Sequence, residues 1–205
     1  MENEFISVRT PGATHRLVLL HGWGADGDDL IPIGKELIKG LSEIKMELIA
    51  LRAPQNHPEG FGRQWYGLFP PDWDAVPASI EQLTARIKAF STSSIPLENT
   101  FLLGFSQGGA MALDAGCEMK LAGLICCSSY PHPKWIAPQV SPPVLLLHGE
   151  QDQVVPIEAS RKVFNCLKLN KIDAELVVFE GGHEIPQNLL VKLQLNIMKW
   201  IVKDE

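Results

Sequence analysis

The sequence predicts an α/β fold with a mostly parallel central sheet and helices on both faces. Apolar runs of strand length alternate with segments whose apolar residues repeat at helical spacing. Such alternation is typical of parallel βαβ units, and the continuous apolar runs are typical of strands covered on both faces. With 205 residues, 45% of them hydrophobic, residues 1–205 are predicted to form a single domain.

The first half of the chain predicts a short edge strand, two core strands and two helices. A long stretch rich in proline and aromatic residues, residues 52–77, separates the last strand of this half from the second helix. The expected strands are Phe5–Arg9, Arg16–Leu20 and Glu47–Leu51, and the expected helices are Leu30–Leu41 and Ser79–Phe90.

The second half predicts three further pairs, each a strand followed by a helix or an irregular excursion, and then a last strand and helix. The excursion, residues 128–142, contains four prolines. The expected strands are Thr100–Phe105, Leu121–Cys127, Pro143–Gly149 and Ala174–Glu180, and the expected helices are Gln107–Met119, Ile157–Leu169 and Pro186–Val202.

In sheets of this kind, ligands bind beyond the carboxyl ends of the strands. The loops to inspect therefore follow Leu20, Leu51, Phe105, Leu147 and Phe179, and four of these five carry a polar or glycine cluster. The site is expected there.

The run Gly104-Phe105-Ser106-Gln107-Gly108 fits the pattern G-x-S-x-G at a predicted passage from strand to helix. That is the context of a nucleophile elbow, where a sharp, strained turn pushes a serine hydroxyl into the cleft. A Cβ at Gly104 or Gly108 would strike the opposite limb of the turn, and Gly109 would let the helix pack close to the sheet. Ser106 is the candidate nucleophile.

A serine hydroxyl needs a base, and the base needs an acid that orients it, in the chain order Ser, Asp or Glu, His. Three histidines follow Ser106. His132 lies between prolines and is expected to face solvent, and His148 ends a buried strand and is interpreted as structural. His183, in a glycine-flanked loop after the last strand, is free to reach the cleft and is the candidate base.

The acid is expected in the loop after the strand that ends at Gly149. Asp152 is favoured because a short rigid run, Val154 to Pro156, follows it, and Glu150 is the alternative. A structural interpretation, in which Asp152 only caps the next helix, leaves the triad order unexplained.

Acyl transfer also needs donors aimed at the developing oxyanion, each worth roughly 10²–10³ in rate. The residue after the nucleophile, Gln107, supplies one backbone N–H at the positive end of its helix. The second is expected from Trp23 in the loop "HGWGADG". His21 is interpreted as a brace for that loop.

Composition excludes several classes of partner. The net charge of −6 and the lack of basic runs argue against nucleic acid and anionic membranes. The apolar runs are too short for stable membrane insertion, and the N-terminus shows no signal-peptide pattern. The four cysteines lie in apolar segments without zinc-type spacing. We therefore expect buried free thiols, a cytoplasmic protein, and no metal or other cofactor.

Four stretches together resemble the carboxylesterase/phospholipase family of α/β hydrolases, which includes acyl-protein thioesterases, also called lysophospholipases. They are "LVLLHGWGADGDD", "IPLENTFLLGFSQGGAMAL", "VLLLHGEQDQVVP" and "VVFEGGHEIP". The resemblance implies the α/β-hydrolase fold, and it places nucleophile, acid and base on Ser106, Asp152 and His183. It places the oxyanion donors on Trp23 and Gln107, although the family often has a smaller residue where Trp23 stands.

The resemblance implies a serine hydrolase that acts on small-molecule esters or thioesters through an acyl-enzyme. Alternatives are a peptidase or amidase of the same fold, or a binding protein that kept the fold without the chemistry. No excursion is long enough for the helical lid of large lipases, so a minimal lid or none is expected. The candidate acyl-pocket residues, which could instead be core, are Trp65, Tyr66, Leu68, Phe69 and Trp73.

Overall fold

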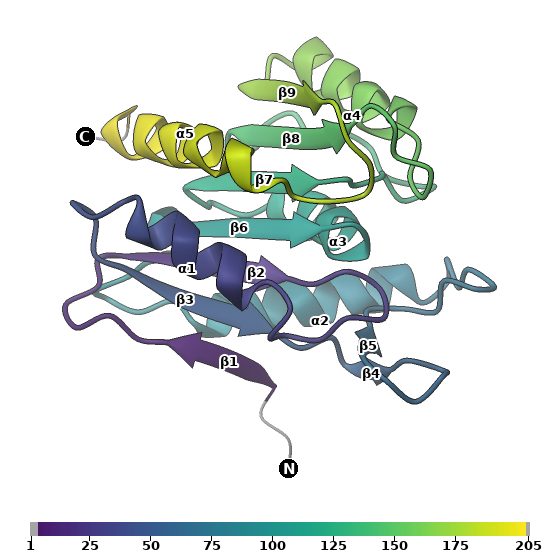
Figure 1. The fold of residues 1–205 in the computed structure, drawn as a ribbon, viewed down its shortest axis with the longest axis horizontal. Helices are drawn as coiled ribbons and strands as arrows, with labels where there is room; N and C mark the ends of the chain where they lie inside the picture. Colours follow the sequence, from purple (N-terminus) through teal and green to yellow (C-terminus); the bar gives the residue numbers. More distant parts are fainter. Residues whose placement is uncertain (1–3, 204–205) are drawn as a thin grey trace.

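The computed structural model describes residues 4–203 and has a central sheet of seven strands (Figure 1). The strand order is β1-β3-β2-β6-β7-β8-β9, and every neighbouring pair is parallel except β1 with β3. The strands are β1 (Phe5–Val8), β2 (His15–Leu20), β3 (Met46–Leu51), β6 (Thr100–Phe105), β7 (Gly123–Cys127), β8 (Val144–Gly149) and β9 (Ala174–Phe179). The predicted fold class is confirmed.

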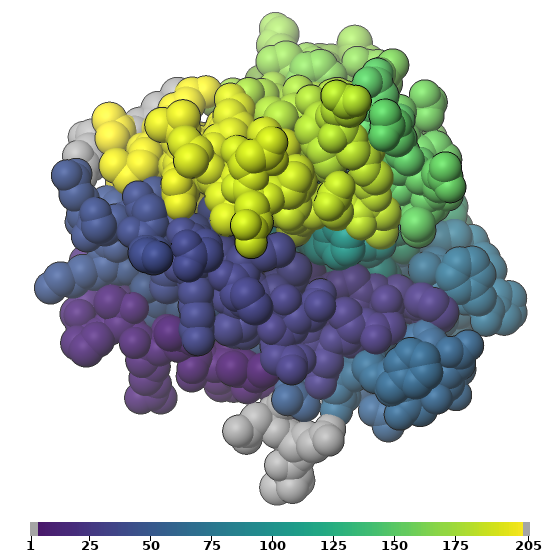
Figure 2. All heavy atoms as spheres, in the orientation of Figure 1, coloured from purple at the N-terminus to yellow at the C-terminus, as the bar shows by residue number. Residues whose placement is uncertain are grey.

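Helices cover both faces of the sheet because the side chains of each buried strand alternate between two cores. Leu17 and Leu19 of β2 pack on one face, and Val18 and Leu20 on the other. The first face carries α1 (Ile31–Lys39) and α5 (Leu190–Lys203), which lie side by side in Figure 2. The second carries α2 (Val76–Ala89), α3 (Gln107–Gly116) and α4 (Glu158–Leu169).

The structure differs from the sequence prediction mainly at helix starts and in the long aromatic loop. The helix α2 begins at Val76, before the predicted Ser79, because Pro77 fits the first turn. The proline- and aromatic-rich stretch, residues 52–77, contains a small antiparallel sheet of β4 (Gln55–Asn56) and β5 (Arg63–Gln64), and its last two residues belong to α2. Two single-turn 3₁₀ helices, η1 (Leu97–Asn99) and η2 (Gln187–Leu189), precede β6 and α5.

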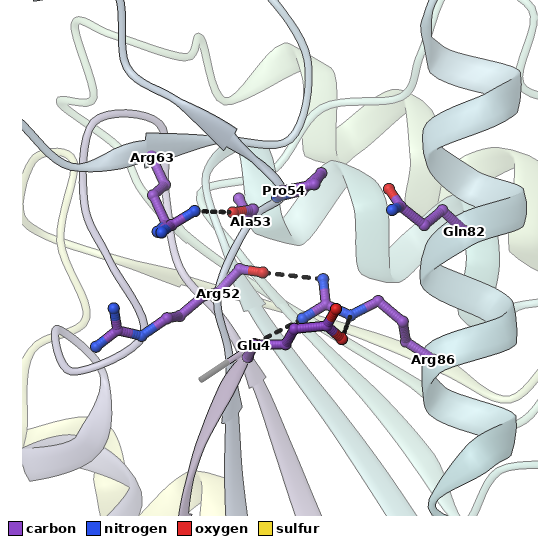
Figure 3. A pocket seen from close by; sticks show the side chains of 7 residues that line it. All are labelled: Glu4, Arg52, Ala53, Pro54, Arg63, Gln82 and Arg86. Atoms are coloured by element: carbon purple, nitrogen blue, oxygen red, sulfur yellow. Dashed lines mark hydrogen bonds and ion pairs between the residues drawn. The ribbon is translucent and has the colours of Figure 1, made fainter. Parts of the chain in front are cut away.

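Arginine side chains tie the start of this loop to α2 and to Glu4, the residue before β1 (Figure 3). Arg86 of α2 donates to the carbonyl oxygens of Arg52 at 2.9 Å and Glu4 at 2.7 Å. Arg63 donates to the carbonyl oxygen of Ala53 at 3.1 Å. These bonds satisfy backbone carbonyls that the loop leaves outside the sheet, and they fix where the loop departs from β3.

The parallel strands end at a common edge, so the loops that follow them lie together. In the sheet register Leu20 pairs with Gly104, Phe105 with Cys127 and Gly149 with Phe179. The candidate residues for catalysis all follow one of these strand ends.

Candidate active site

Ser106 occupies a strained turn between β6 and α3. Its φ and ψ are 53° and −118°, a conformation that L-residues rarely adopt. A residue held in such a region costs on the order of 1–3 kcal/mol and persists only where its surroundings enforce it. Here the backbone N–H of Ser106 donates to the carbonyl oxygen of Cys127 at 2.9 Å, and α3 begins at the next residue. The local geometry is that of a nucleophile elbow.

Glycines allow this turn because neighbouring backbone passes where a side chain would stand. A Cβ on Gly104 would overlap the carbonyl oxygen of Gly108, so Gly104 faces the opposite limb of the turn as predicted. A Cβ on Gly108 would instead overlap the carbonyl oxygens at the end of β2. Gly109 lies against Ser129 and the carbonyl oxygen of Cys127, which lets α3 pack close to the sheet.

Asp152 and His183 form a hydrogen-bonded pair at the ends of β8 and β9. The Oδ2 atom of Asp152 lies 2.7 Å from Nδ1 of His183, and Oδ1 accepts the backbone N–H groups of Val154 and Val155, each at 2.9 Å. Burial raises the pKa of Asp152, but the N–H of Val155, the His183 ring and the N–H of Val154 together lower it below its ordinary value. The carboxylate is therefore ionised at neutral pH and accepts from Nδ1–H, which leaves Nε2 of His183 with a lone pair.

Ser106 and His183 line the same cleft, which has a volume of about 490 Å³. Asp152 lies behind His183 with its side chain fully buried. The rest of the lining is largely apolar: Gly22, Trp23, Ala25, Asp29, Leu68, Phe69, Phe105, Tyr130, Val154, Val155, Pro156 and Ala159. A serine, a histidine with an accepting nitrogen and a buried carboxylate thus meet at one cleft, an arrangement suited to nucleophilic catalysis.

The other two histidines after Ser106 are buried outside the cleft lining. His148 is fully buried, with Nδ1 2.7 Å from the Ser160 hydroxyl and Nε2 2.8 Å from the Val155 carbonyl oxygen. Its Nε2 also lies 3.3 Å from Oδ2 of Asp152, so it supports the acid from behind. His132 is 4% exposed, and the expectation that it faces solvent is wrong.

Of the two positions predicted to supply oxyanion donors, Trp23 lines the cleft, and Gln107, which is not in the lining, directly follows Ser106. Gln107 is the first residue of α3, where backbone N–H groups have no intrahelical carbonyl partner. Its side chain is buried and holds the aromatic loop, since Oε1 accepts the N–H of Trp65 at 3.0 Å and Nε2 donates to the Tyr66 carbonyl oxygen at 2.9 Å. Trp23 lines the cleft, and its indole packs against Phe69 with ring centroids 5.2 Å apart.

His21 braces the loop that carries Trp23. Its Nε2 accepts the N–H of Ala53 at 3.0 Å, so Nδ1 carries the proton and donates to the Gly22 carbonyl oxygen at 2.7 Å. Burial lowers the pKa of His21, although the bond to Gly22 opposes this. The neutral imidazole therefore connects the loop after β2 to the loop after β3.

The aromatic loop contributes fewer residues to the cleft than the five proposed from the sequence. Leu68 and Phe69 line it, and Phe69 is 74% exposed at its rim. Trp65 and Tyr66 are buried in the core and are not among the lining residues. Trp73 lines a different cavity, together with His132.

Sequence reasoning missed several residues of the cleft lining. They include Tyr130, which follows β7, Val155 and Pro156, which precede α4, and Ala159 in the first turn of α4. The signal for Tyr130 is its place three residues beyond the strand end at Cys127. The sequence predicts only an excursion there, because that loop lacks the glycine cluster of its neighbours.

Within residues 4–203, the structure contains no group of three or more His, Cys, Asp or Glu side chains that could hold a metal ion. None of the helices described is both long enough and apolar enough to cross a membrane. The described cysteines are free: Cys117, Cys126 and Cys127 are buried and Cys166 is half-buried.

Comparison with known proteins gives a consistent result. Residues 1–201 match the family model described as Phospholipase/Carboxylesterase. Acyl-protein thioesterase 1 of Yarrowia lipolytica is 28% identical over 220 residues, which cover 93% of this chain and 97% of that protein. The crystal structure of esterase PE8 superposes with a TM-score of 0.81 at 29% identity, covering 95% and 97% of the two chains. SOBER1 of Arabidopsis thaliana superposes with a TM-score of 0.74 at 25% identity, covering 91% and 99%.

Proposed function

The chain belongs to the phospholipase/carboxylesterase family of hydrolytic enzymes, and from that premise we propose that it cleaves carboxylic esters or thioesters through an acyl-enzyme on Ser106. The observation that carries the proposal is the pairing of Asp152 with His183 at 2.7 Å, beside a cleft that His183 shares with a serine on a strained elbow. The proposed triad is Ser106, Asp152 and His183.

In the proposed reaction the Ser106 hydroxyl attacks the carbonyl carbon, and Nε2 of His183 takes its proton. The tetrahedral oxyanion is held by the backbone N–H groups of Gln107 and Trp23. His183 then returns the proton to the departing alkoxide or thiolate. A water molecule, deprotonated by the same nitrogen, then attacks the acyl carbon. The bond from that carbon to Oγ of Ser106 breaks, Oγ takes the proton back from His183, and the acid is released. Asp152 keeps the proton on Nδ1, so that Nε2 can accept at each of these steps.

The substrate is proposed to be a small-molecule ester or thioester with an apolar acyl group. Leu68, Phe69 and Phe105 line the cleft and would contact such a chain. Relatives named as thioesterases support the thioester, and structural neighbours named as esterases support the oxygen ester. The two differ in their leaving group, and the same triad serves both.

Steady-state hydrolysis of p-nitrophenyl butyrate and of butyrylthiocholine, an oxygen ester and a thioester, tests the proposal. Ser106→Ala and His183→Ala should each lose about 10⁴-fold or more in kcat, and the double variant should be little worse, because the residues act as one unit. Ser93→Ala, a change at an exposed serine, is the matched control. Retained activity in His183→Ala with loss in His148→Gln would move the base to His148.

A further inference from the structure

We propose that the phenol oxygen of Tyr130 is a hydrogen-bond acceptor in the cleft, and that it selects esters and thioesters that carry an N–H or O–H group near the scissile carbonyl. This inference rests on the proposed function, because it assigns a substrate class to the same cleft. Tyr130 is one of the residues that line the cleft, and it is half-buried.

A continuous chain of hydrogen bonds leads from Tyr130 into the protein. Its hydroxyl oxygen lies 2.7 Å from that of Tyr66, which lies 3.0 Å from Nε2 of His132. On the other side of the ring, Nδ1 of His132 lies 2.9 Å from Oδ2 of Asp114. Tyr66 is fully buried and His132 is 4% exposed, so both depend on these partners rather than on water.

The chemistry of the four groups sets the direction of the chain. An ionised Asp114 only accepts, so Nδ1 of His132 carries a proton and, in the neutral ring, Nε2 has only a lone pair. Tyr66 must then donate its hydrogen to Nε2. Its oxygen is left to accept, and the hydrogen of Tyr130 fills that place. Tyr130 therefore has only lone pairs left to present to a bound molecule.

The phenols stay neutral in this role. Burial raises the pKa of Tyr130 to about 12, and it raises the pKa of Tyr66 as well. A neutral acceptor of fixed direction in a largely apolar cleft favours a ligand with a matching donor. It disfavours one that presents only a carbonyl or ether oxygen, because that oxygen would face the lone pairs of Tyr130.

Two other polar side chains at the cleft, Trp23 and Asp29, bear on this role. The indole nitrogen of Trp23 donates to Oε1 of Gln64 at 3.0 Å. The Asp29 carboxylate is also an acceptor in the lining, and its side chain is exposed. The contribution of Tyr130 must therefore be measured by changing Tyr130 and its supporting chain while Asp29 is kept.

The experiment compares the p-nitrophenyl esters of N-acetyl-β-alanine and of N-acetyl-N-methyl-β-alanine, with the hexanoate as a reference without an amide. The two amides differ by one N–H donor at an otherwise constant length. In wild type, kcat/KM for the N–H ester should exceed that for the N-methyl ester by roughly two- to tenfold, the value of one net hydrogen bond. Tyr130→Phe should bring this ratio to about 1.

A variant outside the cleft separates the effect of the direction of the hydrogen-bond chain from the effect of the shape of the cleft. Asp114→Asn does not touch the cleft lining, but its amide donates as well as accepts, so it no longer fixes the His132 tautomer. The ratio should fall from the wild-type value toward 1, whereas purely structural damage would lower both rates together. Glu118→Gln, an exposed change of the same charge just after α3, should leave the ratio unchanged.

Binding of the same esters to Ser106→Ala can be measured by tryptophan fluorescence. This measurement tests the inference even if the wild type does not hydrolyse the esters. If wild type hydrolyses none of the three esters, the proposed function fails, and the ratio of the two Kd values still tests Tyr130. The inference is supported if Ser106→Ala binds the N–H ester with a lower Kd than the N-methyl ester, and if the double variant Ser106→Ala/Tyr130→Phe binds the two with equal Kd. Equal rates and affinities for the two amides, or a preference for the N-methyl ester, overturn it.

Discussion

Replacing Asp152 by asparagine tests the coupling between the carboxylate and His183 most sharply. The carboxylate accepts on both oxygens: Oδ1 from the N–H groups of Val154 and Val155, and Oδ2 from Nδ1 of His183. An asparagine has one oxygen and one NH₂ group in the same volume, so it can serve only one of these two sets of donors.

The structure decides which set it serves. If the NH₂ group faced the backbone, two N–H groups would lose their acceptor, at about 1–3 kcal/mol for each that stays buried. If it faces His183, the ring adopts the other tautomer and accepts the NH₂ at Nδ1. The loss is then confined to the 3.3 Å contact with Nε2 of His148, which still has the Val155 carbonyl oxygen at 2.8 Å. The second arrangement is favoured, and it puts the proton on Nε2. His183 then cannot take the proton of Ser106, and kcat should fall by roughly 10⁴-fold, about 5.5 kcal/mol in activation free energy.

The assay is steady-state hydrolysis of p-nitrophenyl butyrate, with circular dichroism to show that the variant is folded. Glu150→Gln is the matched control, because Glu150 is exposed in the same loop and was the alternative acid. A folded Asp152→Asn that retained more than about a tenth of wild-type kcat would refute the reasoning, since one decade is only about 1.4 kcal/mol. An inactive Glu150→Gln beside it would move the acid to Glu150.

Three further predictions follow from the same geometry. Gly104→Ala should destabilise the fold by about 1–3 kcal/mol in urea unfolding and abolish activity, because its Cβ would overlap the Gly108 carbonyl oxygen; wild-type stability would contradict this. The folded-state pKa of His21 is lowered, so its stabilisation is complete above about pH 6.5 and is lost as pH falls through the folded value. The stability difference between wild type and His21→Gln should therefore shrink on acidification from pH 7, and a difference that grows would be the wrong sign. On p-nitrophenyl esters from acetate to palmitate, kcat/KM should rise a few-fold for each methylene that the cleft buries, at about 0.8 kcal/mol each, and then level off. The rate should show no jump when the ester concentration passes the solubility limit of the ester. Sharp activation by emulsified ester would reveal a cover over the cleft.

Strands and the elbow could be predicted from the sequence because their signals are local. The continuous apolar runs at Leu17–Leu20 and Phe101–Leu103 are buried on both faces, as that pattern predicts. Gly104 and Gly108 lie on either side of Ser106 at the end of a strand. This spacing predicts a sharp turn, and Ser106 has the positive φ of such a turn. Asp152 and His183 follow neighbouring strands, so the parallel topology alone brings them to one edge.

The walls of the cleft could not be predicted, because they depend on contacts between distant segments. Gln107 fixes Trp65 and Tyr66 by two hydrogen bonds across more than 40 positions, and these bonds turn both rings into the core. No local pattern separates them from Leu68 and Phe69, which line the cleft. His132 appeared solvent-facing from its flanking prolines, yet Asp114 on α3 and Tyr66 enclose it.

The central claim, that Ser106 is the nucleophile, is tested most directly by a fluorophosphonate probe followed by intact-mass and peptide mass spectrometry. The account predicts one adduct per chain, on the peptide that contains Ser106, with labelling slowed in His183→Ala and absent in Ser106→Ala. Labelling of a folded Ser106→Ala protein, or an adduct on another serine of the wild type, would contradict it.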